Sequence, residues 1–467
     1  MRPPLATTLL IIAIATSLWL PNLFTYGMFL DGVINANVAK QYANGVGSFF
    51  TLQECNCPNG AYVGHPPLAF VMQATMFKAC GSAFYMDKVY SLLCAVAQLF
   101  LIRLLWLKAV PQHNLKKLVW LPCLLWLLSP IISWGYSSNL LENTMSMFTT
   151  ATLIVMIAYM RGGKLVWLYA IAAALPSFAA LLSKGPVAMF VLAAPIVFVG
   201  AYEGYNLRKA LSFMTVYLTA LTLLALAIWV LPEGNSYIRA YFEAQLMPSL
   251  TPSDASVIAR LRIIPFLLKA LLPILAIAIA AYAATKTKWL NNIKVHVGNK
   301  VAHRFLILGL CATLPIMLSN KQSAFYVIPA IPVFAIGFAL IIAEVVSMLI
   351  DRYRAPIFHK AIGWLSLMII ASMVSLSIFN YGSVLRDGDM LTDAEQIHDL
   401  LREDQIIADP LYQFVDEYQL KAYLNRLYSI SVHNDMPTKW YLVKPETTLP
   451  EKAELVYKGK TLSVYTL

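Results

Sequence analysis

The residues best suited to chemistry stand just outside the membrane-length apolar runs of this chain. Asp31 follows the first such run by a few residues, and a polar, aromatic stretch then leads to Gly64-His65-Pro66-Pro67-Leu68. A carboxylate is a candidate general base. A residue before proline has a restricted backbone, which suits His65 to hold a fixed position. Asp31 is therefore placed to act on a substrate that itself lies at the membrane surface.

Further polar residues stand at the ends of later apolar runs. Glu142 begins one run, directly after Trp134-Gly135-Tyr136-Ser137-Ser138-Asn139. Ionisable groups beside hydrocarbon are costly and usually functional. Lysine and arginine bind phosphate, arginine through a bidentate fork. The candidates for binding an anion are Lys184, Lys321, Arg260 and Arg262, and those for positioning a substrate are His65, Asn35 and Arg239.

Each of these residues also has a purely structural interpretation. Asp31 is a favoured N-cap type, and Glu142 is an acid at a helix start, where the helix dipole favours it. Lys184 and Lys321 can serve as anchors that extend from the membrane to the interface. Ser183-Lys184-Gly185 lacks the preceding glycines of a nucleotide-binding loop. A divalent metal held by Asp31, His65 and Glu142 is a further possibility that these residue types allow.

The composition is that of a polytopic membrane protein. The chain has 467 residues, of which 59% are hydrophobic and 13% charged, and its mean hydropathy is +0.65. Soluble domains have about 45–50% apolar and about 25% charged residues. The net charge of +11 comes mostly from short loops between apolar runs, which favours membrane topology over nucleic-acid binding as its cause.

About 20 apolar residues cross a bilayer as a helix. We expect a helical bundle of about eleven spans, of which the division between the fifth and sixth is the weakest. The eleven runs are 6–24, 88–107, 118–135, 142–160, 165–182, 186–201, 210–231, 263–284, 304–319, 325–349 and 361–380. Leu5 to Leu23 has no small-residue cleavage pattern after it and is interpreted as a retained first span.

Loop charges predict the orientation of the bundle. With a cytoplasmic N-terminus every inside loop is basic, whereas the short outside loops have only Lys184 and Lys321. The basic inside residues are Lys108, Lys116, Lys117, Arg161, Lys164, Arg208, Lys209, Lys286, Lys288, Lys294, Lys300, Arg304, Arg352, Arg354 and Lys360. This orientation places three longer segments outside, namely 25–87, 232–262 and the tail from about 385.

The external segments have patterns of their own. Residues 31–46 and 67–80 place apolar residues at helical spacing and predict short helices on the membrane surface, with 67–80 as part of a span the alternative. The 385–467 tail predicts a small soluble α/β domain appended to a 1–384 membrane domain. Its helices are expected at 392–402 and 412–425, and its strands at 405–409, 428–432, 440–444, 453–458 and 461–466.

Three of the six cysteines lie outside the apolar runs, namely Cys55, Cys57 and Cys80. Cys55 and Cys57 are too close in sequence for an easy mutual disulfide, so we expect one of them to pair with Cys80 if that face is oxidising. Cysteine spacing of the metal-finger type is absent from the sequence.

Four motifs in order give the chain a family resemblance. They are Phe29-Leu30-Asp31-Gly32, Gly64-His65-Pro66-Pro67-Leu68, Ser183-Lys184-Gly185-Pro186 and Lys321-x-x-x-Phe325-Tyr326-Val327-Ile328-Pro329-x-x-Pro332. With the topology, this pattern resembles the integral-membrane glycosyltransferases of the C-type fold over about residues 5–350. Within that fold it looks like the branch of the protein O-mannosyltransferases and lipid A aminoarabinose transferases.

The resemblance implies a polyprenyl-phosphate-linked sugar donor and transfer with inversion at the anomeric carbon. It maps the family's catalytic acid onto Asp31, its second external acid onto Glu142, and donor-binding residues onto Lys184 and Tyr326. The expected acceptor is a hydroxyl of a lipid, a glycan or a protein at the outer face of the cytoplasmic membrane. The chain departs from its relatives at two positions: Gly32 stands where many have a second acid, and His65 stands where the aminoarabinose transferases have lysine.

Two other classes of function compete with this interpretation. A transporter or lipid flippase would need polar residues deep within spans, and most runs here lack charge at mid-depth. A transferase of phosphoglycan or lipid groups would use the same external residues for a different donor. The tail either guides the acceptor or stabilises the external face.

Overall fold

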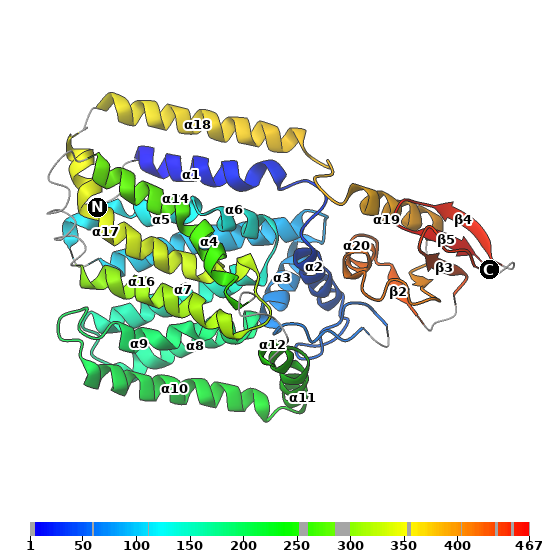
Figure 1. The fold of residues 1–467 in the computed structure, drawn as a ribbon, viewed down its shortest axis with the longest axis horizontal. Coiled ribbons are helices and arrows are strands. Elements are labelled where there is room, and N and C mark those ends of the chain that lie inside the picture. Colours follow the sequence, from blue (N-terminus) through cyan, green and yellow to red (C-terminus); the bar gives the residue numbers. More distant parts are fainter. Residues whose placement is uncertain are drawn as a thin grey trace.

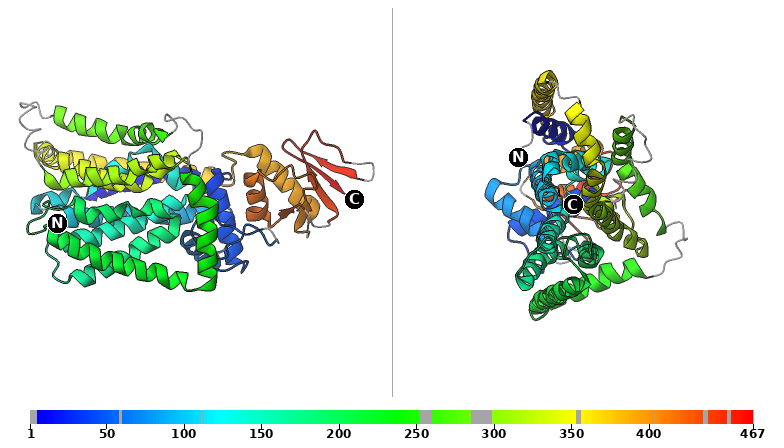
Figure 2. Two further views of the ribbon diagram at one scale, coloured as in Figure 1. Left: turned by 60° about the horizontal axis from the view of Figure 1, so that its bottom comes forward. Right: turned by 90° about the vertical axis from the view of Figure 1, so that its left-hand side faces the viewer.

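The chain folds into a bundle of long helices capped at one end by short helices and a small mixed domain (Figure 1). The computed structural model describes residues 5–57, 60–110, 112–251, 260–284, 299–352, 356–402, 404–434, 438–449 and 453–466. The layer of short helices, called the end layer below, and the C-terminal domain lie at the same end of the bundle, which we call the covered end (Figures 1 and 2).

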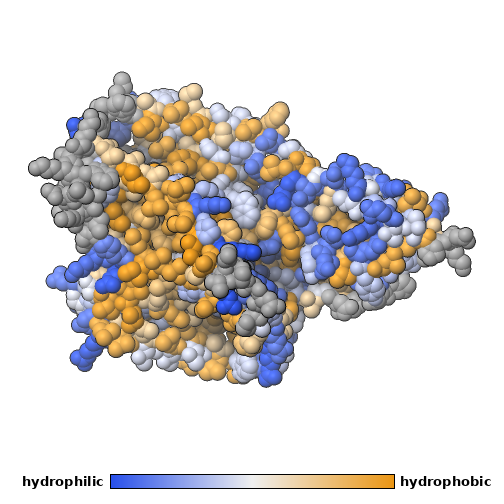
Figure 3. Space-filling model, viewed as in Figure 1, coloured by the Kyte–Doolittle hydropathy of each residue, from blue (hydrophilic) through white to orange (hydrophobic). Residues whose placement is uncertain are grey.

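Nine helices of the described residues are long and apolar enough to cross a membrane. Their helical cores are α1 (Leu5–Trp19), α4 (Met86–Ala109), α7 (Leu141–Met160), α8 (Val166–Lys184), α10 (Leu207–Trp229), α14 (Ile263–Ala283), α16 (Lys300–Thr313), α17 (Ile331–Arg352) and α18 (Pro356–Phe379). On the face that Figure 3 shows, apolar residues cover most of the bundle, and hydrophilic residues gather at its two ends and on the C-terminal domain. The chain is thus a multi-pass membrane protein.

Two predicted spans take a different form from a straight helix. The 118–135 run is broken into α5 (Trp120–Leu127) and α6 (Pro130–Ser137), with a bend of 73° between the two halves. Pro130 at the first position of α6 has no N–H to continue the preceding helix, which accounts for the break.

The 186–201 run begins as a 3₁₀ segment, η3 (Pro186–Ala193), and ends in the four-residue α9 (Ala194–Val197). A 3₁₀ helix rises about 2 Å per residue, so a shorter segment covers more depth. Beyond it, the Tyr202 hydroxyl donates to the Ala109 carbonyl at 3.2 Å, at the far end of α4. The segment therefore returns across the bundle even though it is too short for a regular spanning α-helix.

Polar contacts supplement apolar packing between the central helices. The Thr152 and Ser177 hydroxyls lie 3.1 Å apart between α7 and α8, and Ser177 and Tyr217 lie 2.6 Å apart between α8 and α10. Ala173 and Ala174 of α8 are fully buried, and such small residues allow helices to approach closely. These contacts hold α7, α8 and α10 together, and the site below lies where α7 begins and α8 ends.

The end layer contains the predicted surface helices. α2 (Leu30–Ala43) and α3 (Leu68–Cys80) match the helices expected at 31–46 and 67–80. α3 has 13 residues and ends at Gly81 before α4 begins, so it is not part of a span. The 232–262 segment adds α11 (Pro232–Tyr241), a π-helical turn η4 (Phe242–Leu246) and α12 (Met247–Leu250).

The C-terminal domain has the predicted order of helices and strands. Its elements are α19 (Gly388–Leu401), β1 (Ile406–Ala408), α20 (Tyr418–Tyr428), β2 (Ser431–His433), β3 (Trp440–Val443), β4 (Glu454–Lys458) and β5 (Ser463–Thr466). The sheet order is β2-β1-β3-β5-β4, with β1 parallel to β2 and β3, and β5 antiparallel to β3 and β4. Its core includes Ile397, Ile407, Leu424, Leu442 and Val464.

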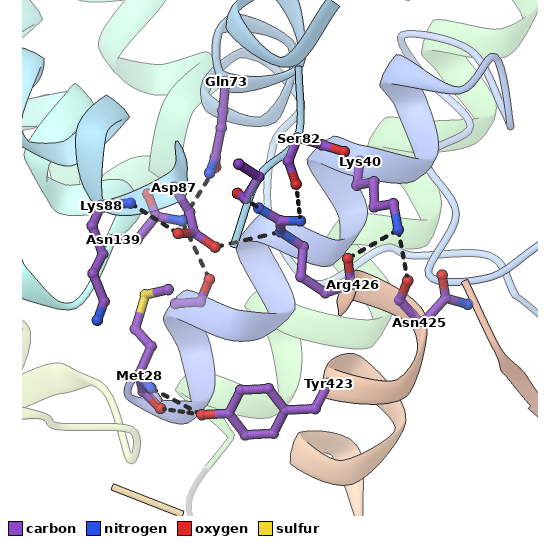
Figure 4. A network of polar contacts seen from close by, with 12 residues as sticks. Met28, Lys40, Gln73, Ser82, Asp87, Lys88, Asn139, Tyr423, Asn425 and Arg426 are labelled. Atoms are coloured by element: carbon purple, nitrogen blue, oxygen red, sulfur yellow. Dashed lines mark hydrogen bonds and ion pairs between the residues drawn. The ribbon is translucent and has the colours of Figure 1, made fainter. Parts of the chain in front are cut away.

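A buried polar network joins this domain to the membrane bundle through α20 (Figure 4). Arg426 pairs with Asp87 at 3.4 Å and donates to the carbonyls of Ser82 and Ala83, each at 2.8 Å. Lys40 of α2 donates to the carbonyls of Asn425 and Arg426 at 3.2 and 2.9 Å. We call these residues, with Lys88 and Tyr423, the domain junction.

The cysteine prediction is wrong. The sulfur atoms of Cys55 and Cys57 are bonded to each other, whereas Cys80 is free and exposed. Cys80 ends α3, and the loop with Cys55 and Cys57 lies beside the C-terminal domain, where both cysteines line a cleft with α20 residues. The fold thus separates Cys80 from the pair in the loop.

Candidate active site

The start of α7 is held against α2 by reciprocal amide contacts. Asn35 donates through Nδ2 to the Asn139 carbonyl at 3.1 Å, and Asn139 donates to the Gly32 carbonyl at 3.2 Å and to Gln73 Oε1 at 3.3 Å. Asn139 has a positive φ of 48°, a conformation that asparagine tolerates better than most residues. Asn35 is therefore a structural clamp on the turn that precedes Glu142, and it does not line the cavity described below.

The same close approach explains the glycine after Asp31. A Cβ atom at residue 32 would overlap the backbone carbonyl oxygen of Ser138. A second acid at this position would therefore require α2 to move away from the loop before α7. Gly32 fixes the approach of the two segments, and it places the turn after Asp31 directly against the approach to Glu142.

Glu142, Lys184 and His65 form a contiguous buried chain. Lys184 Nζ lies 3.1 Å from Glu142 Oε1 and 3.2 Å from His65 Nε2. The side chains of Lys184 and Glu142 are only 6% and 1% exposed. Three segments far apart in sequence supply these groups: the start of α7, the last residue of α8, and the loop before α3. The ends of α7 and α8 that meet here belong to the covered end of the bundle.

The backbone after Lys184 turns sharply to allow this arrangement. Gly185 has φ +98°, and a Cβ atom there would overlap the Tyr241 hydroxyl. Glycine alone adopts such a conformation without strain. The helix therefore ends at Lys184, and Tyr241 of α11 closes over the turn.

Aromatic rings surround the Lys184 ammonium. Its Nζ lies 5.7 Å from the centre of the Phe325 ring and 5.8 Å from that of the Tyr326 ring, within the range of cation–π attraction. Apart from the ion pair with Lys184, neither carboxylate oxygen of Glu142 has a hydrogen-bond partner among the described residues. This charge cluster is thus electrostatically paired but incompletely hydrogen-bonded.

Asp31 lies near the cluster in the first turn of α2. Burial raises the pKa of the Asp31 carboxyl, and the nearby Lys184 ammonium partly opposes that shift. A raised pKa brings a carboxylate closer to the range in which it works well as a general base. Asp31 does not itself line the large cavity described below, whereas Lys184 and His65 of the cluster do.

His65 is held neutral. Burial and the positive charges of Lys184 and Lys321 lower the pKa of its imidazole well below the ordinary value. A neutral imidazole accepts a hydrogen bond at one nitrogen, which fits Nε2 as the acceptor for the Lys184 ammonium. His65 is therefore a poor second cation for a phosphate, and Lys184 supplies the charge at this position.

A cavity of 640 Å³ opens from the cluster into the bundle. His65, Lys184, Lys321 and Tyr326 lie on its wall together with Tyr241. Most of the remaining wall is apolar and comes from η3, η4, α12, α16 and the 3₁₀ segment η5 (Leu314–Leu318): Pro186, Val187, Met189, Phe190, Leu192, Ala193, Leu246, Leu250, Cys311, Ala312, Pro315, Ile316 and Leu318. The cavity thus joins a cationic end to a mostly apolar stretch of wall, which we call the apolar trough.

The predicted cations separate into two groups. Lys321 reaches the cavity and donates to Gln245 Oε1 at 3.1 Å. Arg239 is exposed and lies over the Trp229 ring, with its guanidinium carbon 5.6 Å from the ring centre. Arg260 and Arg262 do not line the cavity, although the Arg260 carbonyl accepts from Gln322 Nε2 at 2.9 Å.

The residues predicted for a metal do not fit one. Within the part of the chain that the structure describes, no three His, Cys, Asp or Glu side chains are grouped to hold a metal ion. Between Glu142 and His65 the Lys184 ammonium already contacts both groups. A cation of the protein's own occupies the position that a shared metal would need.

Sequence reasoning missed three residues of the site. Tyr241 and Gln245 line the cavity from the 232–262 segment, and Tyr62 lies close enough to Asp31 for that carboxylate to contribute to the raised pKa of its phenol. Tyr241 and Gln245 are four residues apart, and this spacing predicts that both side chains lie on the same face of a helix. For Tyr62 the sequence offers no comparable signal.

Comparisons with known proteins agree with this geometry at the level of the fold. A search with protein-family models finds no match, and a search of curated protein sequences also finds none. Two solved structures of ArnT from Cupriavidus metallidurans are similar over 98% of this chain and 97% of theirs. The structure bound to undecaprenyl phosphate has a TM-score of 0.64 at 14% identity, and the apo structure has 0.62 at 13%. The chain has the C-type fold of membrane glycosyltransferases, as the motifs predict.

Proposed function

We propose that this protein is an inverting glycosyltransferase that moves a sugar from a polyprenyl-phosphate donor to a hydroxyl of a lipid, glycan or protein. The reaction takes place at the outer face of the cytoplasmic membrane. In this arrangement the N-terminus is cytoplasmic and the C-terminal domain extracytoplasmic, as the basic inside loops favour.

The cavity is the observation that carries this proposal. A polyprenyl phosphate is a long apolar chain with an anionic head, and the 640 Å³ cavity joins an apolar trough to a wall with Lys184 and Lys321. Lys184 is buried, so its attraction for a phosphate is screened less by water than that of a surface lysine. The similar fold of ArnT, solved with undecaprenyl phosphate, supports a lipid of the same kind.

The chemistry follows from the charges at the end of the trough. The acceptor oxygen forms a bond to the anomeric carbon while the bond from that carbon to the phosphate oxygen breaks. Asp31 takes the proton of the acceptor hydroxyl. The leaving group is polyprenyl phosphate, and its growing charge is stabilised by Lys184 and Lys321. Attack opposite the leaving phosphate inverts the anomeric configuration.

The other residues position these groups. Glu142 holds the Lys184 ammonium at 3.1 Å, and His65 receives its hydrogen bond from the other side. Tyr326 lies on the cavity wall beside Lys184 and is placed to donate to a phosphate oxygen. The proposed steps are assigned to side chains, and among the described residues Asp31, His65 and Glu142 are not grouped to hold a metal ion.

Transfer by purified protein in vesicles tests the proposal. The assay supplies labelled undecaprenyl-phosphate sugar with envelope lipids and glycans as acceptors, and follows the label. The Asp31→Asn protein should bind donor normally and lose transfer, with Asn44→Asp, an exposed change beyond the end of α2, as the control. Wild-type turnover by Asp31→Asn contradicts the role of the base. Movement of intact donor between leaflets without transfer would identify a flippase instead.

A further inference from the structure

A second cavity lies between the first external segment and the C-terminal domain. It has a volume of 330 Å³, within the range of about 300–1,000 Å³ typical of small-molecule sites. We call it the junction cleft. None of its lining residues lines the larger cavity. They are Ile34, Asn37, Glu54, Cys55, Cys57, Gly60, Tyr418, Lys421, Ala422, Asn425, Val432, His433 and Asn434.

Two buried polar atoms in the junction cleft lack partners. Asn37 Oδ1 and His433 Nε2 have no hydrogen-bond partner among the described residues, although their side chains belong to residues that are only 3% and 6% exposed. Asn37 Nδ2 donates to the Glu54 carbonyl at 2.7 Å, which fixes the amide and leaves Oδ1 as a free acceptor. Buried polar groups in native proteins are nearly always satisfied. Two buried polar atoms without partners, one from α2 and one from the C-terminal domain, indicate a polar ligand in the cleft.

The remaining lining suits a polyhydroxylated molecule. Glu54 offers a carboxylate, Asn434 an amide, and Tyr418 an exposed ring at the cleft. Lys421 lies 5.0 Å from the centre of that ring and donates to the Val415 carbonyl at 2.7 Å. Amides, a carboxylate and an imidazole provide both donors and acceptors, as hydroxyl groups require, and an aromatic face packs against the C–H face of a sugar ring.

The junction cleft is also connected to the proposed base. Ile34 and Asn37 stand on α2 about one and two turns after Asp31, so the cleft and the base share one short helix. Tyr62 is within electrostatic reach of both the Glu54 and the Asp31 carboxylates. A ligand in the cleft therefore contacts the helix that carries the base, through residues that do not line the larger cavity.

We propose that the junction cleft binds the acceptor, and that the acceptor is a glycan whose sugar residue is held by Asn37, His433 and the Tyr418 ring. This inference rests on the proposed function and deepens it, because it selects a carbohydrate among the lipid, glycan and protein acceptors. It also gives the C-terminal domain a direct part in acceptor recognition, beyond covering the external face.

Ligand binding tests the proposal without requiring catalysis. The probe is the mixture of oligosaccharides released from the envelope of the source cells by mild acid, added to the full-length protein in nanodiscs. Saturation-transfer NMR detects sugar protons that contact the protein. We expect a signal from the wild type that is reduced about tenfold in His433→Ala, the loss expected for one hydrogen bond in a desolvated site. Asn434→Trp, which fills the rim, should reduce it further.

A matched control separates the cleft from the interface around it. Tyr423→Phe removes contacts of the domain junction to Met28 and Asp387 but does not change a lining residue. Its signal should equal that of the wild type. An equal signal in the wild type and in Asn434→Trp, or no signal in the wild type, overturns the proposal. Competition by an unglycosylated peptide mixture at equal concentration also overturns it, in favour of a protein acceptor.

Failure of the proposed function is a separate result. Release of labelled sugar from undecaprenyl-phosphate donor, including release to water, reports donor chemistry alone. If donor is never cleaved while oligosaccharide binds at the cleft, the transferase proposal fails and the cleft remains a glycan site. If donor is cleaved normally while the cleft variants bind oligosaccharide like the wild type, only the acceptor inference fails.

Discussion

The domain junction and the Lys184 cluster are both buried groups of charge, but their polar atoms are satisfied to different degrees. At the junction, Lys88 Nζ donates to the Asn22 carbonyl and to the carbonyl and hydroxyl of Thr25, at 2.7 to 3.2 Å. Arg426 has two carbonyl acceptors as well as its carboxylate partner (Figure 4). In the cluster, Lys184 faces one carboxylate and one imidazole, and Glu142 has no further hydrogen-bond donor among the described residues.

This difference distinguishes charged residues that stabilise the fold from charged residues that are available to a ligand. A buried cation with several carbonyl or hydroxyl acceptors is a fixed joint, because any ligand would have to displace several good hydrogen bonds. A buried lysine with spare donor capacity, aromatic neighbours and an adjacent cavity has the features that we expect of an anion-binding site. The comparison predicts that changes at the junction act mainly on stability, whereas changes at the cluster act mainly on turnover.

The largest expected effect on stability is at the junction. Arg426→Met leaves the Asp87 carboxylate buried without its partner, and loss of one member of a buried pair costs about 3–5 kcal/mol. We expect a lower melting temperature in detergent and faster proteolysis of the C-terminal domain. Lys444→Met is the control, because its pair with Glu417 is exposed and worth about 0–1 kcal/mol. Equal melting temperatures for the two variants would contradict the comparison.

Gly32→Ala should show the next largest effect. Its methyl group meets the Ser138 carbonyl, so α2 must shift from the loop before α7, at a cost of about 1–3 kcal/mol for overpacking. Because Asp31 is the neighbouring residue, transfer should fall more than donor binding. Gly45→Ala tests a glycine beyond α2 with open space around it, although its positive φ adds some strain. A Gly32→Ala protein with normal melting and turnover would show that this contact does not position the base.

Removal of a cation from the cavity should have a smaller effect, confined to the donor. Lys321→Met is expected to raise the donor KM about tenfold, as for one lost charged hydrogen bond, with little change in the melting temperature. Arg262→Met removes an exposed cation that does not line the cavity and should leave the donor KM unchanged. Equal shifts in both variants would indicate a general electrostatic effect of the surface.

The pH dependence should show the smallest effect. The raised pKa of Asp31 means that the base is protonated at a higher pH than an ordinary aspartate, so kcat should fall as pH decreases through that raised value. His65→Gln should leave this acid limb in place, because the low pKa of His65 keeps its imidazole neutral near pH 7. If kcat instead falls at the pH typical of an unperturbed aspartate, the pKa of the base is not raised. If His65→Gln abolishes the fall, the titrating group is not Asp31.

The sequence predicts the layout of this fold well because its signals are local. Apolar runs, basic loops and the strand and helix order of 385–467 each follow from neighbouring residues, and the structure shows the corresponding spans and sheet. The 118–135 and 186–201 runs differ because Pro130 breaks one and Pro186 begins a 3₁₀ segment in the other. The composition of a run shows how apolar it is, but it does not show whether the helix that forms from it is bent.

The site is predicted less completely because pairings across the fold are not local. Residue type and position at the ends of apolar runs single out Glu142, Lys184, His65 and Lys321. The structure brings these four residues to one cluster and its adjoining cavity. Arg239, Arg260 and Arg262 have the same residue type but lie away from the cavity wall. Whether a cation of an external segment faces inward depends on how that segment packs, which spacing alone does not determine.

Single-turnover release of labelled sugar by Lys184→Gln tests the central claim most directly. The full-length protein in vesicles receives undecaprenyl-phosphate sugar, and release of the sugar is measured beside folding, monitored by the melting temperature. Loss of a preorganised group that stabilises a developing charge typically costs about 10²–10³ in rate. We predict a reduction of that size in a protein that still folds and binds donor. A folded Lys184→Gln protein that releases sugar at the wild-type rate would contradict the assignment of this cluster to the leaving phosphate.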